Sequence, residues 1–243
     1  MIRRLAVANQ KGGTGKTTTA WAIMAGAAAR GWRTMAIDMD PQGNLSYLLN
    51  ADLSRPTIAD ALAGTAEAAK IVQQTGRGAI IPAGPGIASL TDTEALQRAL
   101  DPIYRGYDLI VIDCPPTLGT PLLACIRAAT EILIPLQADP LSIQGLYQMR
   151  GCIDQTKTRA RIDGAFLTRY SGRSMISREM ARAIRERCAQ LNIPYIDTPI
   201  REGVAIREAQ LMGEDIYSYA PRSNPAADYT ALLNALDIIT TID

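Results

Sequence analysis

A glycine-rich stretch near the start of the chain constrains its fold more than any other feature. Residues 10–18 read Gln-Lys-Gly-Gly-Thr-Gly-Lys-Thr-Thr and follow a short apolar run, Leu5–Ala8. Successive glycines let neighbouring backbone N–H groups point into one concavity, and the helix predicted from Lys16 to Arg30 adds its positive N-terminal end. The stretch therefore predicts a phosphate-binding loop between a buried strand and a helix, which is typical of proteins that bind nucleoside triphosphates.

This loop follows the pattern G-x-x-x-x-G-K-[S/T] with one departure. The first glycine position holds Gln10, and the next residue is a second lysine, Lys11. Lys16 is expected to bind the β- and γ-phosphates, and Thr17 to ligate Mg²⁺ beside them. The other residues expected to contact the phosphates are Gly12, Gly13, Thr14, Gly15 and Thr18.

Two more predicted strands end in aspartates. Thr34–Asp38 leads into Asp-Met-Asp-Pro-Gln-Gly-Asn, and the apolar run of Tyr107–Asp113 leads into Cys-Pro-Pro. Ligands of open α/β sheets bind at the carboxyl ends of the strands. We expect Asp113 to hold the magnesium ion or its water, Asp38 to stand behind the ion, and Asp40 to orient the attacking water. Because a carboxylate is a weak base, slow turnover would follow. The alternative is that these aspartates only cap the turns after them.

Strands alternate with helices along the remaining chain. Further strands are predicted at residues 78–82, 132–135, 164–167 and 194–197, and helices at residues 57–62, 66–73, 92–100, 141–155, 177–191 and 226–236. This alternation predicts an α/β fold like that of P-loop NTPases, with a mostly parallel, twisted sheet and helices on both faces. A length of 243 residues fits one such domain over residues 1–243.

The composition excludes several other classes of protein. Lys and Arg number 25 against 24 Asp and Glu, so any affinity for nucleic acid must come from a local patch. The chain has no histidine, and its four cysteines are widely spaced, which argues against a zinc site or a histidine base. No signal peptide precedes the first strand, and no apolar run approaches the roughly 18 residues of a membrane span. We therefore expect a soluble, cytoplasmic protein with reduced, buried cysteines.

Together these motifs resemble those of the deviant Walker A ATPases, and within them the ParA/Soj partition ATPases. The resemblance covers the whole chain and rests on residues 11–17, 38–44 and 113–116. It implies an ATP-bound dimer that sandwiches two nucleotides, with Lys11 reaching the phosphates of the partner subunit; the alternative is an unpartnered surface lysine. It also implies that Pro199 and Ile200 contact the nucleotide base. Because the first strand begins at residue 2, we expect the short form without an N-terminal helix-turn-helix domain.

The same resemblance implies that the ATP-bound dimer binds nonspecific DNA, associates with the nucleoid, and is released when a ParB-like centromere-binding protein stimulates hydrolysis. Residues 157–207 form a strongly basic segment that suits this role. On the helix predicted at residues 177–191, three arginines share one face, opposite Met180, Ile184 and Leu191. Few aromatic residues accompany them, which favours phosphate contacts over base stacking. The candidates are Arg178, Arg182, Arg185, Arg201 and Arg207. An ordinary solvated helix face is the alternative.

Other functions remain as alternatives. A MinD-like ATPase that cycles on membranes would need a basic amphipathic helix at the C-terminus, but residues 228–243 contain no lysine or arginine. A P-loop amide ligase or an iron–sulfur reductase of the same superfamily fits poorly with the Asp-Pro-Gln-Gly-Asn string and the scattered cysteines. A positioning ATPase for another cargo, such as a chemoreceptor cluster or a carboxysome, would use the same DNA-based mechanism.

Overall fold

The computed structural model describes residues 2–240, and all its strands belong to one sheet. The strands are β1 (Arg3–Val7), β2 (Thr34–Asp38), β3 (Gln73–Thr75), β4 (Gly78–Ile81), β5 (Leu109–Asp113), β6 (Glu131–Leu136) and β7 (Arg161–Leu167). The longer helices are α1 (Lys16–Ala28), α6 (Thr120–Ala128), α7 (Pro140–Thr156), α8 (Met175–Gln190), α9 (Val204–Met212) and α11 (Asn224–Ala235). Shorter helices are α2 (Asn44–Leu48), α3 (Ile58–Leu62), α4 (Ala68–Ile71), α5 (Ala95–Leu100) and α10 (Ile216–Tyr219), with 3-10 turns at residues 85–89 and 104–106.

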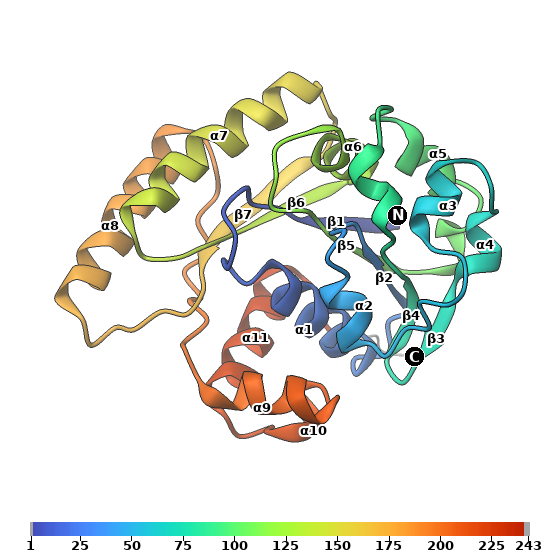
Figure 1. Ribbon diagram of the computed structural model, residues 1–243. Coiled ribbons are helices and arrows are strands. Elements are labelled where there is room, and N and C mark those ends of the chain that lie inside the picture. Colours follow the sequence, from blue (N-terminus) through green and yellow to red (C-terminus); the bar gives the residue numbers. More distant parts are fainter. Residues whose placement is uncertain (1, 241–243) are drawn as a thin grey trace.

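The sheet has the order β3-β4-β2-β5-β1-β6-β7, and every neighbouring pair is parallel except β3 with β4. Helices α3 to α8 cover one face, and α1, α2 and α9 to α11 cover the other (Figure 1). The predicted α/β fold with a mostly parallel sheet is therefore confirmed. Because β1 and β5 are central, the loops after them open at the middle of the carboxyl edge of the sheet.

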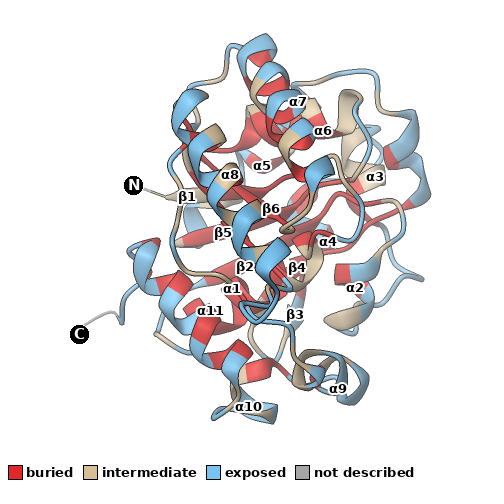
Figure 2. Ribbon diagram, turned by 90° about the vertical axis from the view of Figure 1, so that its left-hand side faces the viewer, coloured by how far each residue is buried: buried red, intermediate tan, exposed pale blue. Residues whose placement is uncertain are grey.

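The strand β5 shows why its sequence is continuously apolar. Ile110 and Ile112 pack into the core beneath α5 to α8, whereas Leu109 and Val111 pack into the core beneath α1 and α11. A central parallel strand is covered on both faces, so alternation with polar residues would bury groups without partners. Figure 2 shows the same division, with buried strands enclosed between helices whose outer surfaces are exposed.

Several predicted elements differ from the structure. The strand predicted at residues 194–197 is wrong: this segment makes only an isolated bridge between Tyr195 and Ala165 before it leaves β7. Pro194 has no N–H to extend a ladder of hydrogen bonds. The helix predicted at residues 92–100 begins at Ala95, because Asp92 instead accepts a hydrogen bond from the backbone of Glu94 at 2.8 Å. Helices α2, α6, α9 and α10 and the strand β3 were not among the predicted elements.

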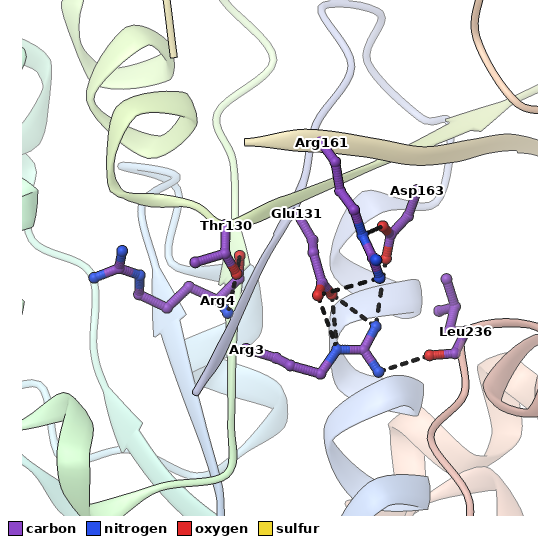
Figure 3. Close-up of polar contacts among 7 residues, drawn as sticks. All are labelled: Arg3, Arg4, Thr130, Glu131, Arg161, Asp163 and Leu236. Carbon is purple, nitrogen blue, oxygen red and sulfur yellow. Dashed lines mark hydrogen bonds and ion pairs between the residues drawn. The ribbon is translucent and has the colours of Figure 1, made fainter. Parts of the chain in front are cut away.

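A cluster of charged side chains joins three strands at the amino edge of the sheet (Figure 3). The Arg3 guanidinium contacts the Glu131 carboxylate at 2.7 Å, and Nη1 of Arg3 donates to the Leu236 carbonyl at 2.6 Å. Arg161 contacts Asp163 at 2.6 Å and Glu131 at 3.4 Å. The first residues of β1, β6 and β7 and the end of α11 are therefore linked by mutually satisfied charges.

All four cysteines are buried and unbridged, as expected. Among residues 2–240, no helix has both the length and the apolar character required to cross a membrane.

Candidate functional site

The glycine-rich loop has the backbone conformation that its sequence predicts. Gly13 and Gly15 adopt φ angles of 75° and 82°, in the left-handed region that favours glycine. Gly15 is the N-cap residue immediately before α1, and no side chain caps the first turn of that helix. The free N–H groups of α1 therefore remain available to phosphate oxygens at the carboxyl edge of the sheet.

Side chains from three strand ends hold this loop in place. Asn9, after β1, accepts a hydrogen bond from the Lys11 backbone at 3.0 Å and donates to the Pro135 carbonyl at 2.7 Å. The Gln137 amide donates to the Gly13 carbonyl at 3.0 Å, and the Thr168 hydroxyl donates to the Thr14 carbonyl at 2.8 Å. The bonds from Gln137 and Thr168 use the carbonyls of Gly13 and Thr14, so they do not occupy the N–H groups of these two residues. Sequence reasoning assigned no role to these side chains, since their supporting contacts form only when β6 and β7 align.

Lys16 is almost fully buried at the base of the loop, and its ammonium donates to the Lys11 carbonyl at 3.1 Å. Burial lowers the pKa of Lys16, and the nearby carboxylates of Asp113 and Asp40 oppose that shift. An ammonium in this position has lost most of its water, so it interacts strongly with any phosphate that enters the loop. Thr17 and Thr18 follow it on the first turn of α1.

Asp38 and Asp113 are register partners at the carboxyl ends of β2 and β5. Both are fully buried. Burial and the neighbouring Asp38 carboxylate raise the pKa of Asp113 well above its ordinary value, while the nearby Thr17 hydroxyl and Lys16 ammonium oppose the shift. Burial likewise raises the pKa of Asp38 to about 6, against hydrogen bonds that favour its charged form. Two adjacent buried carboxylates repel each other when charged, so a cation between or beside them would stabilise their charged forms.

A magnesium site needs carboxylate oxygens that are not already engaged in hydrogen bonds, and the oxygens of Asp113 meet this requirement. Both oxygens are buried, and neither accepts a hydrogen bond of good geometry from residues 2–240. Hard cations prefer carboxylate and hydroxyl oxygens, and Asp113 and Thr17 supply one of each. The residues present therefore fit Mg²⁺, with Asp38 beside them.

A cavity of about 670 Å³ lies at the phosphate-binding loop. Its walls include Gly12, Gly13, Gly15, Lys16, Thr17, Thr18, Asp40, Gln42, Asn44, Pro116, Ile200, Ile206, Gln210 and Tyr229. A cavity of this size suits a nucleotide-sized ligand. Asp40 accepts a hydrogen bond from the Gln42 backbone at 3.0 Å and lies in the wall, where a water could be oriented.

The structure places the predicted base contacts unevenly. Ile200 lines the cavity, whereas Pro199 is not among its lining residues. Sequence reasoning missed several lining residues, among them Ile206, Gln210 and Tyr229. The Gln210 amide donates to the Thr18 hydroxyl at 3.2 Å, which ties α9 to the first turn of α1. No motif marks these residues in the sequence.

Lys11 is not among the residues that line the cavity, and its side chain contacts other residues of the same chain. Its ammonium forms an ion pair with Asp139 and donates to the Gln137 amide oxygen at 3.3 Å. Asp139 also caps α7 by accepting a hydrogen bond from the Ser142 backbone at 3.0 Å. The side chain of Lys11 is about one quarter exposed, so it lies at the mouth of the loop as expected.

The five candidate DNA-binding arginines fall into two groups. Arg178, Arg182 and Arg185 lie on α8, where Arg182 pairs with Glu186 at 3.0 Å and Arg185 pairs with Asp197 at 2.5 Å. The Arg178 guanidinium donates to the carbonyls of residues 172 and 173. Arg201 and Arg207 instead line the nucleotide cavity, and Arg201 forms an ion pair with Asp228 at 2.6 Å. The structure therefore does not unite the five arginines into one patch.

A larger hollow, of about 820 Å³, lies at the amino ends of β2 and β4. Its arginines already have partners, because Arg33 pairs with Asp108 at 2.7 Å and Arg77 with Asp215 at 2.9 Å. The buried carboxylate without hydrogen-bond partners, Asp113, lies instead at the carboxyl edge of the sheet.

A glycine-rich loop at the carboxyl edge of a parallel sheet, beside an unpartnered carboxylate, defines a P-loop nucleotide-binding protein. Residues 2–164 match the family model described as an AAA domain. The chromosome partitioning protein ParA of Myxococcus xanthus is 32% identical over 95% of this chain and 86% of its own length. The chromosome-partitioning ATPase Soj of Thermus thermophilus is 31% identical over 95% of this chain and 94% of its own. The chain therefore belongs to the ParA/Soj family of ATPases, within the ParA/MinD superfamily.

A solved structure supports the same assignment of the fold. Cobyrinic acid a,c-diamide synthase from Mycobacterium smegmatis, with bound ADP and magnesium, has a TM-score of 0.83 and 30% identity, covering 97% of this chain and 94% of that one. The nucleotide and the metal in that relative are the ligands that the phosphate-binding loop and Asp113 predict for this chain.

Proposed function

We propose that this protein is a DNA partition ATPase that binds ATP and Mg²⁺ and dimerises around two nucleotides. The ATP-bound dimer binds nonspecific DNA and leaves it when a ParB-like partner stimulates hydrolysis. The observation that carries the proposal is a buried Lys16 in the cavity wall close to the buried Asp113, whose oxygens accept no hydrogen bond of good geometry from residues 2–240, in a chain of the ParA/Soj family.

The position of each residue in the site suggests its role in ATP binding and hydrolysis. Loop N–H groups and Lys16 bind and orient the phosphates, and Thr17 and Asp113 hold Mg²⁺, which neutralises the charge that develops on the phosphoryl group. Asp40 orients a water toward the terminal phosphate. Lys11 leaves Asp139 and reaches the phosphates of the partner subunit, which makes the dimer depend on ATP.

Coupling to DNA follows from the dimer. Two copies of a basic surface contact more phosphates than one, so the affinity for DNA rises when ATP favours the dimer. Of the three arginines on α8, Arg178 supports this role best, because it has no carboxylate partner among residues 2–240, whereas Arg182 and Arg185 must leave Glu186 and Asp197.

Size-exclusion chromatography with light scattering tests the nucleotide assignment. The wild-type chain is expected to dimerise with ATP and Mg²⁺, Lys16→Ala to remain a monomer, and Asp40→Ala to accumulate as an ATP-bound dimer on DNA. A normal ATP-dependent dimer of Lys16→Ala would refute the assignment of the loop.

DNA binding is tested by titration at several salt concentrations. Arg178→Ala is expected to weaken binding and to reduce the slope of log K against log salt by about 0.9 per lost phosphate contact. Arg105→Ala removes an exposed arginine at the amino edge of the sheet and serves as the control. Equal slopes for both variants would show that α8 presents an ordinary solvated face.

The likeness to cobyrinic acid a,c-diamide synthase makes an amide ligase the second candidate function. Such an enzyme would need no ATP-dependent binding to DNA, so the same titration separates the two functions.

A further inference from the structure

Ser46 is a fully buried residue of α2 that takes no part in the site described so far. Its hydroxyl donates to Oδ2 of Asp38 at 2.7 Å, and its backbone N–H donates to the same oxygen at 2.8 Å. The hydroxyl oxygen also accepts a hydrogen bond from the Ala83 backbone at 2.9 Å, just beyond β4. Ser46 therefore connects the ends of two neighbouring strands through one hydroxyl group.

The direction of these hydrogen bonds is fixed by their chemistry. The Ala83 N–H can only donate, so the Ser46 oxygen must accept from it, and the single hydroxyl proton is left for Asp38. With two donors on Oδ2 and the Asp40 N–H on Oδ1 at 3.1 Å, the Asp38 carboxylate cannot rotate without losing hydrogen bonds. Ser46 thus determines where the Asp38 carboxylate lies relative to Asp113.

The Asp38 carboxylate also binds both ends of the segment between β2 and α2. Asp38 binds the backbone of residue 40 at one end and of residue 46 at the other. Between these points Gly43 takes a φ angle of 66°, and Asp40, Gln42 and Asn44 line the nucleotide cavity. A carboxylate that clasps both ends of a short segment sets the position of the side chains between them.

We propose that Ser46 is a positioning residue for the magnesium and water side of the site. It does not line the cavity; it acts by holding Asp38 beside Asp113 and by fixing the turn that carries Asp40. The link to Ala83 anchors this arrangement to β4, so it persists before any ligand enters. This inference rests on the proposed function, since it concerns the ATP and Mg²⁺ site of that function.

The test separates positioning from simple structural support. The variant Ser46→Ala removes the hydroxyl but keeps the backbone contact to Asp38. The control Thr156→Ala removes a hydroxyl that is also buried, and that donates to the Ile153 carbonyl at 2.7 Å at the end of α7, away from Asp38. Circular dichroism establishes a temperature at which both variants are folded.

Binding of a fluorescent ATP analogue is then measured with EDTA and with Mg²⁺. We expect Ser46→Ala to lower the affinity for Mg²⁺ at the nucleotide site by about 10- to 100-fold, as changes behind metal ligands do, without changing binding in EDTA. Thr156→Ala should keep the wild-type Mg²⁺ dependence. Ser46→Thr, which keeps a hydroxyl at this position, should also retain it.

Two results would overturn the inference. A Mg²⁺ affinity of Ser46→Ala equal to that of Thr156→Ala would make the hydroxyl purely structural. Equal losses in EDTA and in Mg²⁺ would show that the whole cavity had collapsed. Failure of the wild-type chain to bind the ATP analogue would instead refute the proposed function, so the two failures are distinguishable.

Discussion

At the amino edge of the sheet, Arg3, Glu131, Arg161 and Asp163 satisfy one another, whereas at the carboxyl edge the Asp113 oxygens have no hydrogen-bond partner among the described residues. The amino-edge cluster (Figure 3) lies at the first residues of β1, β6 and β7, where Glu131 is buried and Arg161 is exposed, whereas Asp113 is fully buried at the carboxyl end of the central strand β5. The two sites differ in whether the chain supplies hydrogen-bond partners for the buried carboxylate oxygens.

This difference separates support of the fold from capacity to bind. A buried charge without a partner costs several kcal/mol, and a fold retains such a group where a ligand brings the missing partner. The amino-edge cluster joins β1, β6, β7 and α11, so its loss should weaken the fold and spare the site. The carboxyl-edge cluster should behave in the opposite way.

The largest effect on stability is expected from Glu131→Ala. This change removes the main partner of the largely buried Arg3 side chain and leaves its charge poorly compensated, which should lower the free energy of unfolding by about 3 kcal/mol. Glu94→Ala is the matched control, because Glu94 is exposed and pairs with Arg127 at 3.4 Å; it should cost below about 1 kcal/mol. Urea unfolding of both variants measures the difference, and equal costs would contradict the role given to the amino edge.

The free energy of unfolding should depend on pH through Asp38, at the carboxyl edge of the sheet. Burial raises the folded-state pKa of Asp38 to about 6, so between about pH 4 and pH 6 the folded chain holds a proton more firmly than the unfolded chain. The free energy of unfolding therefore falls as the pH rises through this window. Asp38→Asn should remove up to about 3 kcal/mol of this dependence in ligand-free protein. Parallel wild-type and variant curves would exclude Asp38 as the titrating group.

Asp113→Asn should invert the usual effect of a core substitution. Removing the unpartnered charge is expected to stabilise the ligand-free chain by about 1–3 kcal/mol while abolishing ATP turnover. With saturating ATP and Mg²⁺ the order should reverse, because only the wild-type chain gains binding energy from the metal. Thermal unfolding with EDTA and with Mg²⁺-ATP checks both halves, and a destabilised variant in EDTA would show that Asp113 already has a partner.

The smallest effect is expected at the edge of the site, from Asp139→Asn. This variant keeps a polar cap for α7 but weakens the hold on Lys11, whose pair with Asp139 is partly exposed and worth about 0.2–1 kcal/mol. The ATP-dependent dimer should tighten by up to about fivefold, because Lys11 no longer leaves a carboxylate to reach the partner subunit. Sedimentation across a concentration series measures the change, with Lys11→Ala as the variant that loses the dimer. Weaker association of Asp139→Asn would show that Asp139 supports the interface itself.

Local patterns in the sequence predicted much of the site. The turn at residues 10–18 requires glycine at two positions of left-handed backbone, and β5 is apolar on both faces because it is central. Asp38 and Asp113 end buried strands, so parallel pairing alone brings them together. The wrong strand at residues 194–197 shows the limit of such patterns, because a short apolar run beside proline forms a strand only where a neighbour accepts it.

The sequence by itself determined the phosphate-binding loop, the alternation of the main strands and helices, and the acidic ends of β2 and β5, because each depends on contacts between residues close in the chain or on burial of a whole strand. Only the tertiary structure decided which charges are satisfied. Ser46 reaches Ala83, Lys11 meets Asp139, and Arg201 meets Asp228 rather than an open surface. These partners lie far apart in sequence, and a charged or hydroxyl side chain carries no local mark of the group that will compensate it.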